Sequence, residues 1–338
     1  MPSTALSTGV TIEYEVHGSG EPLLLVMGLG GQLVSWPDSV VGGLVDRGFQ
    51  VIVFDNRDIG LSTKGATPPP TIARSLAALL SRRFATSEYL LSDMADDAVG
   101  LLDHLQLQRA HIVGISMGGM IAQTIAINHP TRAKSLTSIM STTGSRRVGQ
   151  PRKRNLLKLF KLTKGGADTA VERNIEVFRI ISGSSFDEAE TCVLSERAFK
   201  RNYDPDGVAR QAAAIAASPD RTPALRTLRL PALVIHGLQD TLVGPSGGFA
   251  TTAAIPGARM LVFPDMGHNI PAVRGSEIFD AIVHIATLAG FQPELATREA
   301  AVSGTSAGGT SAGGTAAGEP EARVTAEGRS HADRTTPL

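Results

Sequence analysis

The stretch that decides the fold is Arg109-Ala-His-Ile-Val-Gly-Ile-Ser-Met-Gly-Gly119. Its apolar first half is typical of a buried strand, and an amphipathic helical pattern continues through residues 120–127. Between strand and helix lies Gly114-Ile-Ser-Met-Gly118, a turn whose glycines let the two elements pass closely. Such a turn exposes the Ser116 hydroxyl at the carboxyl edge of a sheet, with the Met117 N–H beside it. We therefore interpret Ser116 as a nucleophile.

The pattern Gly-x-Ser-x-Gly is not specific by itself in a chain with 36 glycines. It also occurs around Ser246, Ser306 and Ser311, where no apolar strand precedes the serine together with an amphipathic helix after it. The structural context, and not the pattern, singles out Ser116.

Composition limits the classes of protein to consider. The chain has 338 residues and a formal net charge of zero, which gives no electrostatic reason to expect a nucleic-acid partner. A single cysteine rules out an internal disulfide. Residues 1–9 lack the features of a secretory signal, and no apolar run reaches the roughly 18 to 20 residues that span a bilayer. We expect a soluble, cytoplasmic protein without stable membrane insertion; its oligomeric state is left open.

Alternating strand and helix patterns predict an α/β fold with a mostly parallel sheet and helices on both faces. Residues 10–16 alternate between apolar and polar, as in a half-buried edge strand. A helix with Ser92 as its cap is predicted to place Met94, Ala98, Leu101, Leu102 and Leu105 on one buried face. Continuous apolar runs, typical of strands covered on both faces, occur at 23–26, 51–54, 112–113, 136–140, 232–235 and 260–263.

One long interval has helical patterns and no convincing strand. These patterns lie at 155–162, 169–181, 187–199 and 208–217. We interpret residues 144–224 as a helical lid inserted into a core formed by residues 1–143 and 225–296, where it would shape the substrate pocket and exclude water. The composition of residues 297–338, rich in Gly, Ala, Ser and Thr, predicts a disordered tail.

A serine hydroxyl needs a base and a group that orients the base before it becomes a good nucleophile. Asp240 follows the strand predicted at 232–235, and His268 follows the strand predicted at 260–263. Carboxyl ends of parallel strands share one edge of the sheet, so these loops are expected near Ser116. Asp265 is too close to His268 in sequence to meet the ring from the correct side. The sequence thus predicts a catalytic triad of Ser116, Asp240 and His268.

The stabilisation of a tetrahedral oxyanion requires two N–H donors. The Met117 N–H is one candidate, because it directly follows the nucleophile. The glycine-rich loop Met27-Gly-Leu-Gly-Gly31, after the strand at 23–26, supplies the other, and we assign it to the Leu29 N–H.

With these motifs in order, residues 8–291 resemble the α/β-hydrolase superfamily. The resemblance rests on the loop 27–31, the run Phe54-Asp-Asn-Arg-Asp-Ile-Gly-Leu-Ser62, the turn 114–118 and the Asp240/His268 pair. Within the superfamily the chain is similar to bacterial lipases and esterases and to anthracycline methyl-esterases. Many relatives have His-Gly where this chain has Met27-Gly28. The resemblance implies the α/β-hydrolase fold and a serine hydrolase that cleaves carboxylic esters, of small molecules or lipids, without a cofactor.

Other functions remain open at this point. Carbon–carbon bond hydrolases and cofactor-free perhydrolases resemble the chain and use the same triad, although the latter often have an aromatic residue at the position of Leu29. A receptor-like relative that binds a ligand without turnover belongs to a different class of function. Epoxide hydrolases and haloalkane dehalogenases are excluded, since they have aspartate at the position of Ser116.

Two charged segments have ordinary structural explanations. Asp55-Asn-Arg-Asp58 is expected to brace the loops around the site, because no His or Cys cluster with metal-ligand spacing accompanies it. Basic residues interleave with apolar ones between Arg146 and Lys164. We interpret this run as the solvated face of a lid helix, although such a segment also suits anionic lipid or acidic substrates.

Overall fold

A computed structural model describes residues 1–162 and 165–292. In this part of the chain eight strands form one sheet in the order β1-β2-β4-β3-β5-β6-β7-β8. The pairs β1/β2 and β2/β4 are antiparallel and all other pairs are parallel, which confirms the mostly parallel sheet. The strands are β1 (Ser3–Ala5), β2 (Thr11–His17), β3 (Glu21–Val26), β4 (Phe49–Phe54), β5 (Ala110–Ile115), β6 (Ala133–Ile139), β7 (Ala232–Gly237) and β8 (Arg259–Phe263).

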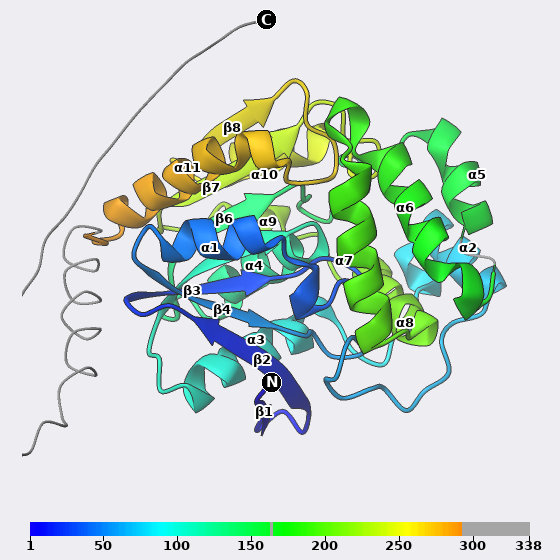
Figure 1. Cartoon of the computed structure of the whole chain (residues 1–338), viewed down its shortest axis with the longest axis horizontal. Helices are drawn as coiled ribbons and strands as arrows, with labels where there is room; N and C mark the ends of the chain where they lie inside the picture. Colours follow the sequence, from blue (N-terminus) through cyan, green and yellow to red (C-terminus); the bar gives the residue numbers. More distant parts are fainter. Residues whose placement is uncertain (163–164, 293–338) are drawn as a thin grey trace, which may run out of the picture.

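Helices cover both faces of the sheet, as Figure 1 shows. Successive residues of β3 enter two different clusters: Leu24 and Val26 belong to one, Leu23 and Leu25 to the other. A strand buried on both faces has no polar alternation, which explains the continuous apolar runs in the sequence. The first cluster includes α3 (Leu91–His104), α4 (Met117–Asn128) and α10 (Ser246–Ala254); the second includes α1 (Asp38–Val45) and α11 (Gly275–Leu288).

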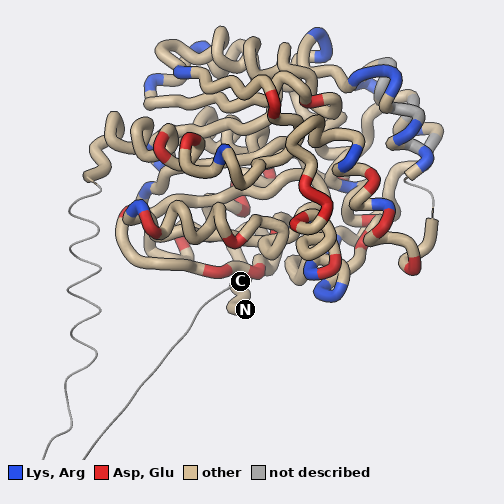
Figure 2. Tube along the Cα trace, turned by 45° about the horizontal axis from the view of Figure 1, so that its top comes forward, with Lys and Arg blue, Asp and Glu red and all other residues tan. Residues whose placement is uncertain are grey.

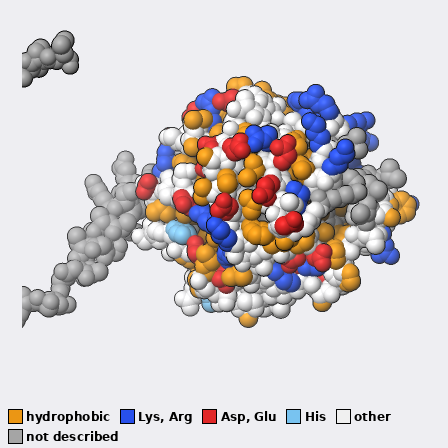
Figure 3. Space-filling view, turned by 45° about the vertical axis from the view of Figure 1, so that its right-hand side comes forward, with side chains coloured by type: hydrophobic (Ala, Val, Ile, Leu, Met, Phe, Trp, Pro, Cys, Tyr) orange, Lys and Arg blue, Asp and Glu red, His pale blue; other side chains and the backbone are white. Residues whose placement is uncertain are grey.

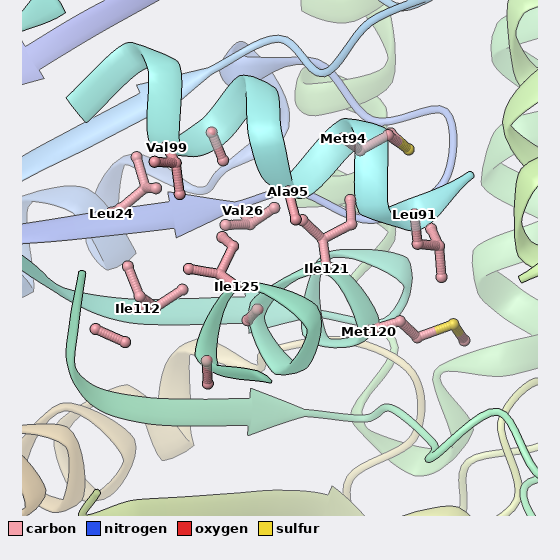
Figure 4. Packing of buried hydrophobic residues seen from close by; sticks show 14 of the residues in the cluster. Leu24, Val26, Leu91, Met94, Ala95, Val99, Ile112, Met120, Ile121 and Ile125 are labelled. Carbon is pink, nitrogen blue, oxygen red and sulfur yellow. The ribbon is translucent and has the colours of Figure 1, made fainter. Parts of the chain in front are cut away.

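The packing of α3 and α4 against the sheet fixes the position of the turn that carries Ser116, the predicted nucleophile. Figure 4 shows Ala95 of α3 and Ile121 of α4 side by side, with Val26 of β3 next to them. All three side chains are inaccessible to solvent. Since α4 begins at Met117, the close packing of this helix also holds the residue before it.

The interval between β6 and β7 is helical. Its described residues, 140–162 and 165–231, contain five α-helices and no strand, in agreement with the predicted patterns. Two of the helices begin at good caps: Asp187 accepts the Glu190 N–H before α7, and Asp204 accepts the Gly207 N–H before α8. The five are α5 (Lys153–Leu162), α6 (Ala170–Ile181), α7 (Glu188–Arg201), α8 (Pro205–Ala217) and α9 (Thr222–Leu225). Figure 1 shows α5 to α8 grouped beside the sheet, with α2 (Ile72–Leu80) next to them.

The prediction of a half-buried edge strand at residues 10–16 is wrong in two respects. β1 pairs with the outer side of β2, so β2 is not at the edge. The alternation also fails, because Glu13 is 7% exposed whereas Val16 is 39% exposed. The Glu13 N–H donates to Ser62, and its carboxylate lies 3.9 Å from the guanidinium of Arg201 in α7. The positive charge of Arg201, from the helical interval, therefore lies close to the carboxylate of this buried glutamate.

The predicted cap of α3 is also wrong. The helix begins at Leu91 and its cap is Leu90, so Ser92 already lies in the first turn. The Asp93 carboxylate accepts the Leu90 N–H at 2.7 Å and thereby satisfies a donor at the helix start. The buried face with Met94, Ala98, Leu101 and Leu102 is confirmed.

The basic segment is exposed on α5, where Lys153, Arg154, Lys158 and Lys161 all face solvent. Lys and Arg gather at this part of the molecule, in the upper right of Figures 2 and 3. No helix among the described residues has the length and apolar character needed to cross a bilayer. The predicted tail, 297–338, lies outside the described residues.

Candidate active site

Ser116 occupies a strained turn between β5 and α4. Its φ and ψ are 55° and −118°, a combination that L-residues rarely adopt. The turn is held from both ends of the serine backbone: the Ser116 N–H donates to Ile139 O, and the Ser141 hydroxyl donates to Ser116 O, both at 2.8 Å. The neighbouring strand β6 and the loop after it thus hold the predicted nucleophile in place.

The glycines of the turn are required by contact with backbone atoms. A Cβ on Gly114 would lie 2.1 Å from the carbonyl oxygen of Gly118. A Cβ on Gly118 would lie 1.9 Å from the carbonyl oxygen of Val26, at the end of β3. No side chain can fit at such distances, so the strand and the helix approach each other only with glycine at both positions.

We expect Gly118→Ala to lower the free energy of unfolding by about 3 kcal/mol or more, because neither backbone segment can move away within the packed core. Urea unfolding measures the change. Gly42→Ala is the matched control: Gly42 lies inside α1, and a Cβ at this position would have no other atom within 4 Å. There alanine should raise the stability by about 0.5 to 1 kcal/mol. Equal effects of the two substitutions would contradict the steric explanation.

Asp240 and His268 meet in the loops after β7 and β8. His268 Nδ1 lies 2.6 Å from Asp240 Oδ2, and the aspartate is completely buried. The other carboxylate oxygen accepts the N–H groups of Leu242 and Val243, each at 2.9 Å. Burial alone would raise the pKa of Asp240, but the charge of His268 and the hydrogen bonds from His236 and His268 outweigh it and lower the pKa to about 2.

The nearby residues His236 and Asp265 have other partners. His236 Nε2 lies 2.9 Å from Val243 O and 3.5 Å from Asp240 Oδ2, so this ring supports the Asp240 loop as expected. Asp265 pairs with Arg274 at 3.0 Å. Its carboxylate is therefore engaged away from His268, in agreement with its exclusion from the predicted triad.

The glycine-rich loop lies directly against Ser116. A Cβ on Gly28 would stand 3.2 Å from Ser116 Cβ. The Gly31 N–H donates to Gly28 O, and Gly30 has a φ of +73° while Leu29 has a negative φ, which together define a type II turn. In the described part of the chain neither the Leu29 N–H nor the Met117 N–H donates to a protein acceptor. Both predicted donors are thus near the serine and not engaged elsewhere.

Not every predicted contact is made. Among the described residues the Ser116 hydroxyl has no hydrogen-bond partner, His268 included. Bonds between a nucleophile and its base are commonly long in proteins without substrate. The structure therefore joins Asp240 to His268 and Gly28 to Ser116, while all of these residues follow the carboxyl ends of strands in one sheet.

The segment 55–58 braces loops and helices, as predicted. The Asp55 carboxylate accepts the Leu33 N–H and pairs with Arg201 of α7 at 2.7 Å. The Asp58 carboxylate accepts the Tyr89 hydroxyl and pairs with Arg210 of α8 at 2.8 Å. Burial and the Asp58 hydrogen bond strongly raise the pKa of Tyr89. Within the described residues no group of three or more His, Cys, Asp or Glu is placed to hold a metal ion.

The helical interval also contacts the loops that carry Asp240 and His268. At the end of α6, Ile181 O accepts the His268 N–H at 2.8 Å, and Ile180 O accepts the Thr241 hydroxyl at 3.1 Å. Sequence patterns did not single out these contacts, nor Arg201, Arg210 and Gln211 on α7 and α8. The only signal for these three residues is that long polar side chains lie in, or just after, segments predicted to be helical.

The fold and this arrangement of loops agree with a match to the alpha/beta hydrolase fold family over residues 21–274, and the chain belongs to this family. It is 28% identical over 298 residues to a rhodomycin D methylesterase of Streptomyces peucetius, covering 79% of this chain and 93% of that protein. It is 26% identical over 282 residues to the 2-hydroxymuconate semialdehyde hydrolase of Pseudomonas sp. (strain CF600), covering 78% and 86%.

The solved structures add the fold alone. A thermophilic esterase from Thermogutta terrifontis is similar with a TM-score of 0.65 and 24% identity, over 86% of this chain and 99% of that chain. An enol-lactonase from Burkholderia xenovorans LB400 is similar with the same TM-score and identity, over 85% and 100%.

Proposed function

We propose that this protein is a serine hydrolase that cleaves carboxylic esters. The observation that carries the proposal is the buried Asp240 held 2.6 Å from His268 Nδ1, in loops that follow strands of the same sheet as the strained Ser116 turn. A carboxylate that accepts the Nδ1 proton leaves Nε2 as the basic nitrogen. This is the protonation state that a base needs in order to activate a serine.

The proposed reaction has two halves. Ser116 Oγ attacks the ester carbonyl while His268 Nε2 takes its proton, and the Leu29 and Met117 N–H groups stabilise the oxyanion. The tetrahedral intermediate collapses, and His268 returns the proton to the departing alcohol. Water, deprotonated by His268, then cleaves the acyl-enzyme, releases the acid and restores the Ser116 hydroxyl. Asp240 stays ionised throughout and holds the imidazole tautomer.

Relatives named for ester cleavage support this proposal. Two rhodomycin D methylesterases, from Streptomyces peucetius and Streptomyces sp. (strain C5), are each 28% identical to the chain over most of its length. Carbon–carbon bond hydrolysis is the second candidate, since the semialdehyde hydrolase of Pseudomonas is similar at 26% identity. The same three side chains would serve either reaction.

The test is the hydrolysis of p-nitrophenyl esters from acetate to palmitate. We expect turnover, and the acyl length that gives the highest kcat/KM separates an esterase for small molecules from a lipase. A fluorophosphonate, which reacts with activated serines, should modify Ser116, as mapped by peptide mass spectrometry. Modification without ester turnover would favour carbon–carbon cleavage. Folded protein that shows neither would favour a ligand-binding function.

A further inference from the structure

Gln211, on α8, joins the helical interval to the turn that carries Leu29. Its side chain is completely buried, and both ends of the amide are used. Oε1 accepts the Gly30 N–H at 3.0 Å, and Nε2 donates to Arg57 O at 2.8 Å. Because the second bond fixes the amide, the Oε1 atom is held in one place. Gln211 thus presents a fixed acceptor to the loop beside Ser116.

The bond to Gly30 acts on the least constrained peptide of the turn. In a turn of four residues the central peptide, here Leu29–Gly30, can rotate by half a turn and interconvert types I and II. Glycine at the third position permits both forms, since a positive φ costs it little. The Gly30 N–H belongs to this central peptide. An acceptor fixed on one side therefore selects the type II form observed.

A second contact from α8 covers the same turn. Val208 precedes Gln211 by three residues and so lies on the same face of the helix. A Cβ on Gly30 would stand 3.1 Å from Val208 Cγ2, a closer approach than most real Cβ contacts, so the valine packs tightly against the turn. The apolar contact closes the turn from outside, while the glutamine orients its central peptide.

We propose that Gln211 is a positioning residue for the oxyanion hole. By anchoring the Gly30 N–H, Gln211 holds the type II turn in place against Arg57 and α8. The Leu29 N–H, one residue earlier in the same turn, is thereby held in position relative to Ser116. The residue touches no reacting atom and acts through the turn. This inference rests on the proposed function, because the Leu29 N–H is assigned there to the oxyanion.

The test compares Gln211→Met with Gln32→Met. Gln32 is also a buried glutamine between core and insertion. Its amide donates to the carbonyl oxygens of Ala198 and Asn202, at the end of α7 and just after it, and accepts from Arg201; it makes no bond to the turn. We expect Gln211→Met to lower kcat for a p-nitrophenyl ester about 10- to 100-fold with KM nearly constant, since donor placement matters mainly in the transition state. Gln32→Met should change kcat less than about threefold, whatever its cost in stability.

Two further measurements separate positioning from a general loss of structure. Binding of an alkyl trifluoromethyl ketone, whose adduct with Ser116 places an oxyanion near Leu29, should weaken in Gln211→Met by the same factor as kcat. Gln211→Glu keeps an oxygen acceptor for the Gly30 N–H, and in its protonated form, which burial favours, it can also donate to Arg57 O, so it should recover most of kcat. If Gln211→Met does not fold, Gln211→Asn replaces it, because the shorter amide cannot reach Gly30. Circular dichroism and the melting temperature establish folding in each case.

The outcomes are distinct. A Gln211→Met protein with wild-type kcat and wild-type ketone affinity overturns this inference and leaves the proposed function intact, as does an equal loss of kcat in Gln32→Met. Wild-type protein without ester turnover overturns the proposed function. In that case the rate of reaction with the fluorophosphonate is compared between Gln211→Met and wild type: a slower reaction of the variant supports the inference about Gln211, and equal rates overturn it. Wild-type protein that neither hydrolyses esters nor reacts at Ser116 overturns both.

Discussion

Ser116→Ala should lower kcat for a p-nitrophenyl ester by about 10⁵- to 10⁶-fold and leave the fold unchanged. The substitution removes the only oxygen that could attack the carbonyl in the proposed mechanism. Alanine can follow the same backbone path, so the contacts of the turn with Ile139 O and Ser141 persist. Steady-state kinetics at saturating ester measure the change. Residual turnover within about 100-fold of wild type would assign the attack to another group.

Ser116→Gly is the informative control for this variant. It also lacks the hydroxyl and should be equally inactive, but glycine tolerates a φ of 55° without a steric cost. We therefore expect the unfolding free energy of the glycine variant to exceed that of the alanine variant by about 1 kcal/mol. This difference is the strain that glycine relieves, reduced by the larger conformational entropy that glycine gives the unfolded chain. Equal stabilities would show that the turn stores no strain at this residue.

Asp240→Asn should lower kcat by about 10⁴-fold at neutral pH. The asparagine oxygen can still accept the N–H groups of Leu242 and Val243. Its amino group would then face His268 Nδ1 and require an acceptor there. The imidazole proton would move to Nε2, the nitrogen that must receive the serine proton. Kinetics of the variant against wild type provide the measurement, and a loss below about tenfold would remove Asp240 from the proposed triad.

The pH dependence of stability provides a check on the same residue. The folded-state pKa of Asp240, about 2, lies below its ordinary value of 3.8, so its contribution is complete above the ordinary value. It is lost as the pH falls toward 2. The difference in unfolding free energy between wild type and Asp240→Asn should therefore shrink between pH 5 and pH 2. A difference that is constant over this range would contradict the depressed pKa.

Much of the candidate site follows from the sequence because its residues lie at the ends of strands. Apolar runs locate the strands, and parallel strands bring their carboxyl ends to one edge. That logic places Ser116, Asp240 and His268 in neighbouring loops without knowledge of any long-range contact. Part of the tight turn at Ser116 is also local information, since a Cβ at Gly114 would clash with Gly118 O, four residues later. The clash at Gly118 is with Val26 O and depends on the packing of β3.

The errors and omissions concern contacts between distant segments. Glu13 lies beneath Arg201, 188 positions later in the chain, so its burial has no local signal. Gln211 contacts Gly30 only because α8 folds back over the loop after β3. The start of α3 shows the same limit on a smaller scale. Ser92 is a good capping residue, but the helix already begins at Leu91, and Asp93 accepts the Leu90 N–H from within the first turn.

Four residues of the helical interval bond to loops of the core, which limits how the substrate pocket of this protein can be exchanged. They are Ile180, Ile181, Arg201 and Gln211. Exchanging the whole helical interval for that of a relative would transplant the supports of the His268 loop and of the Leu29 turn along with the pocket wall. A chimera designed to change substrate preference should therefore retain residues 180–185 and 198–211. The graft can then include α5 and the parts of α6 and α7 that precede residues 180 and 198, which make none of these bonds.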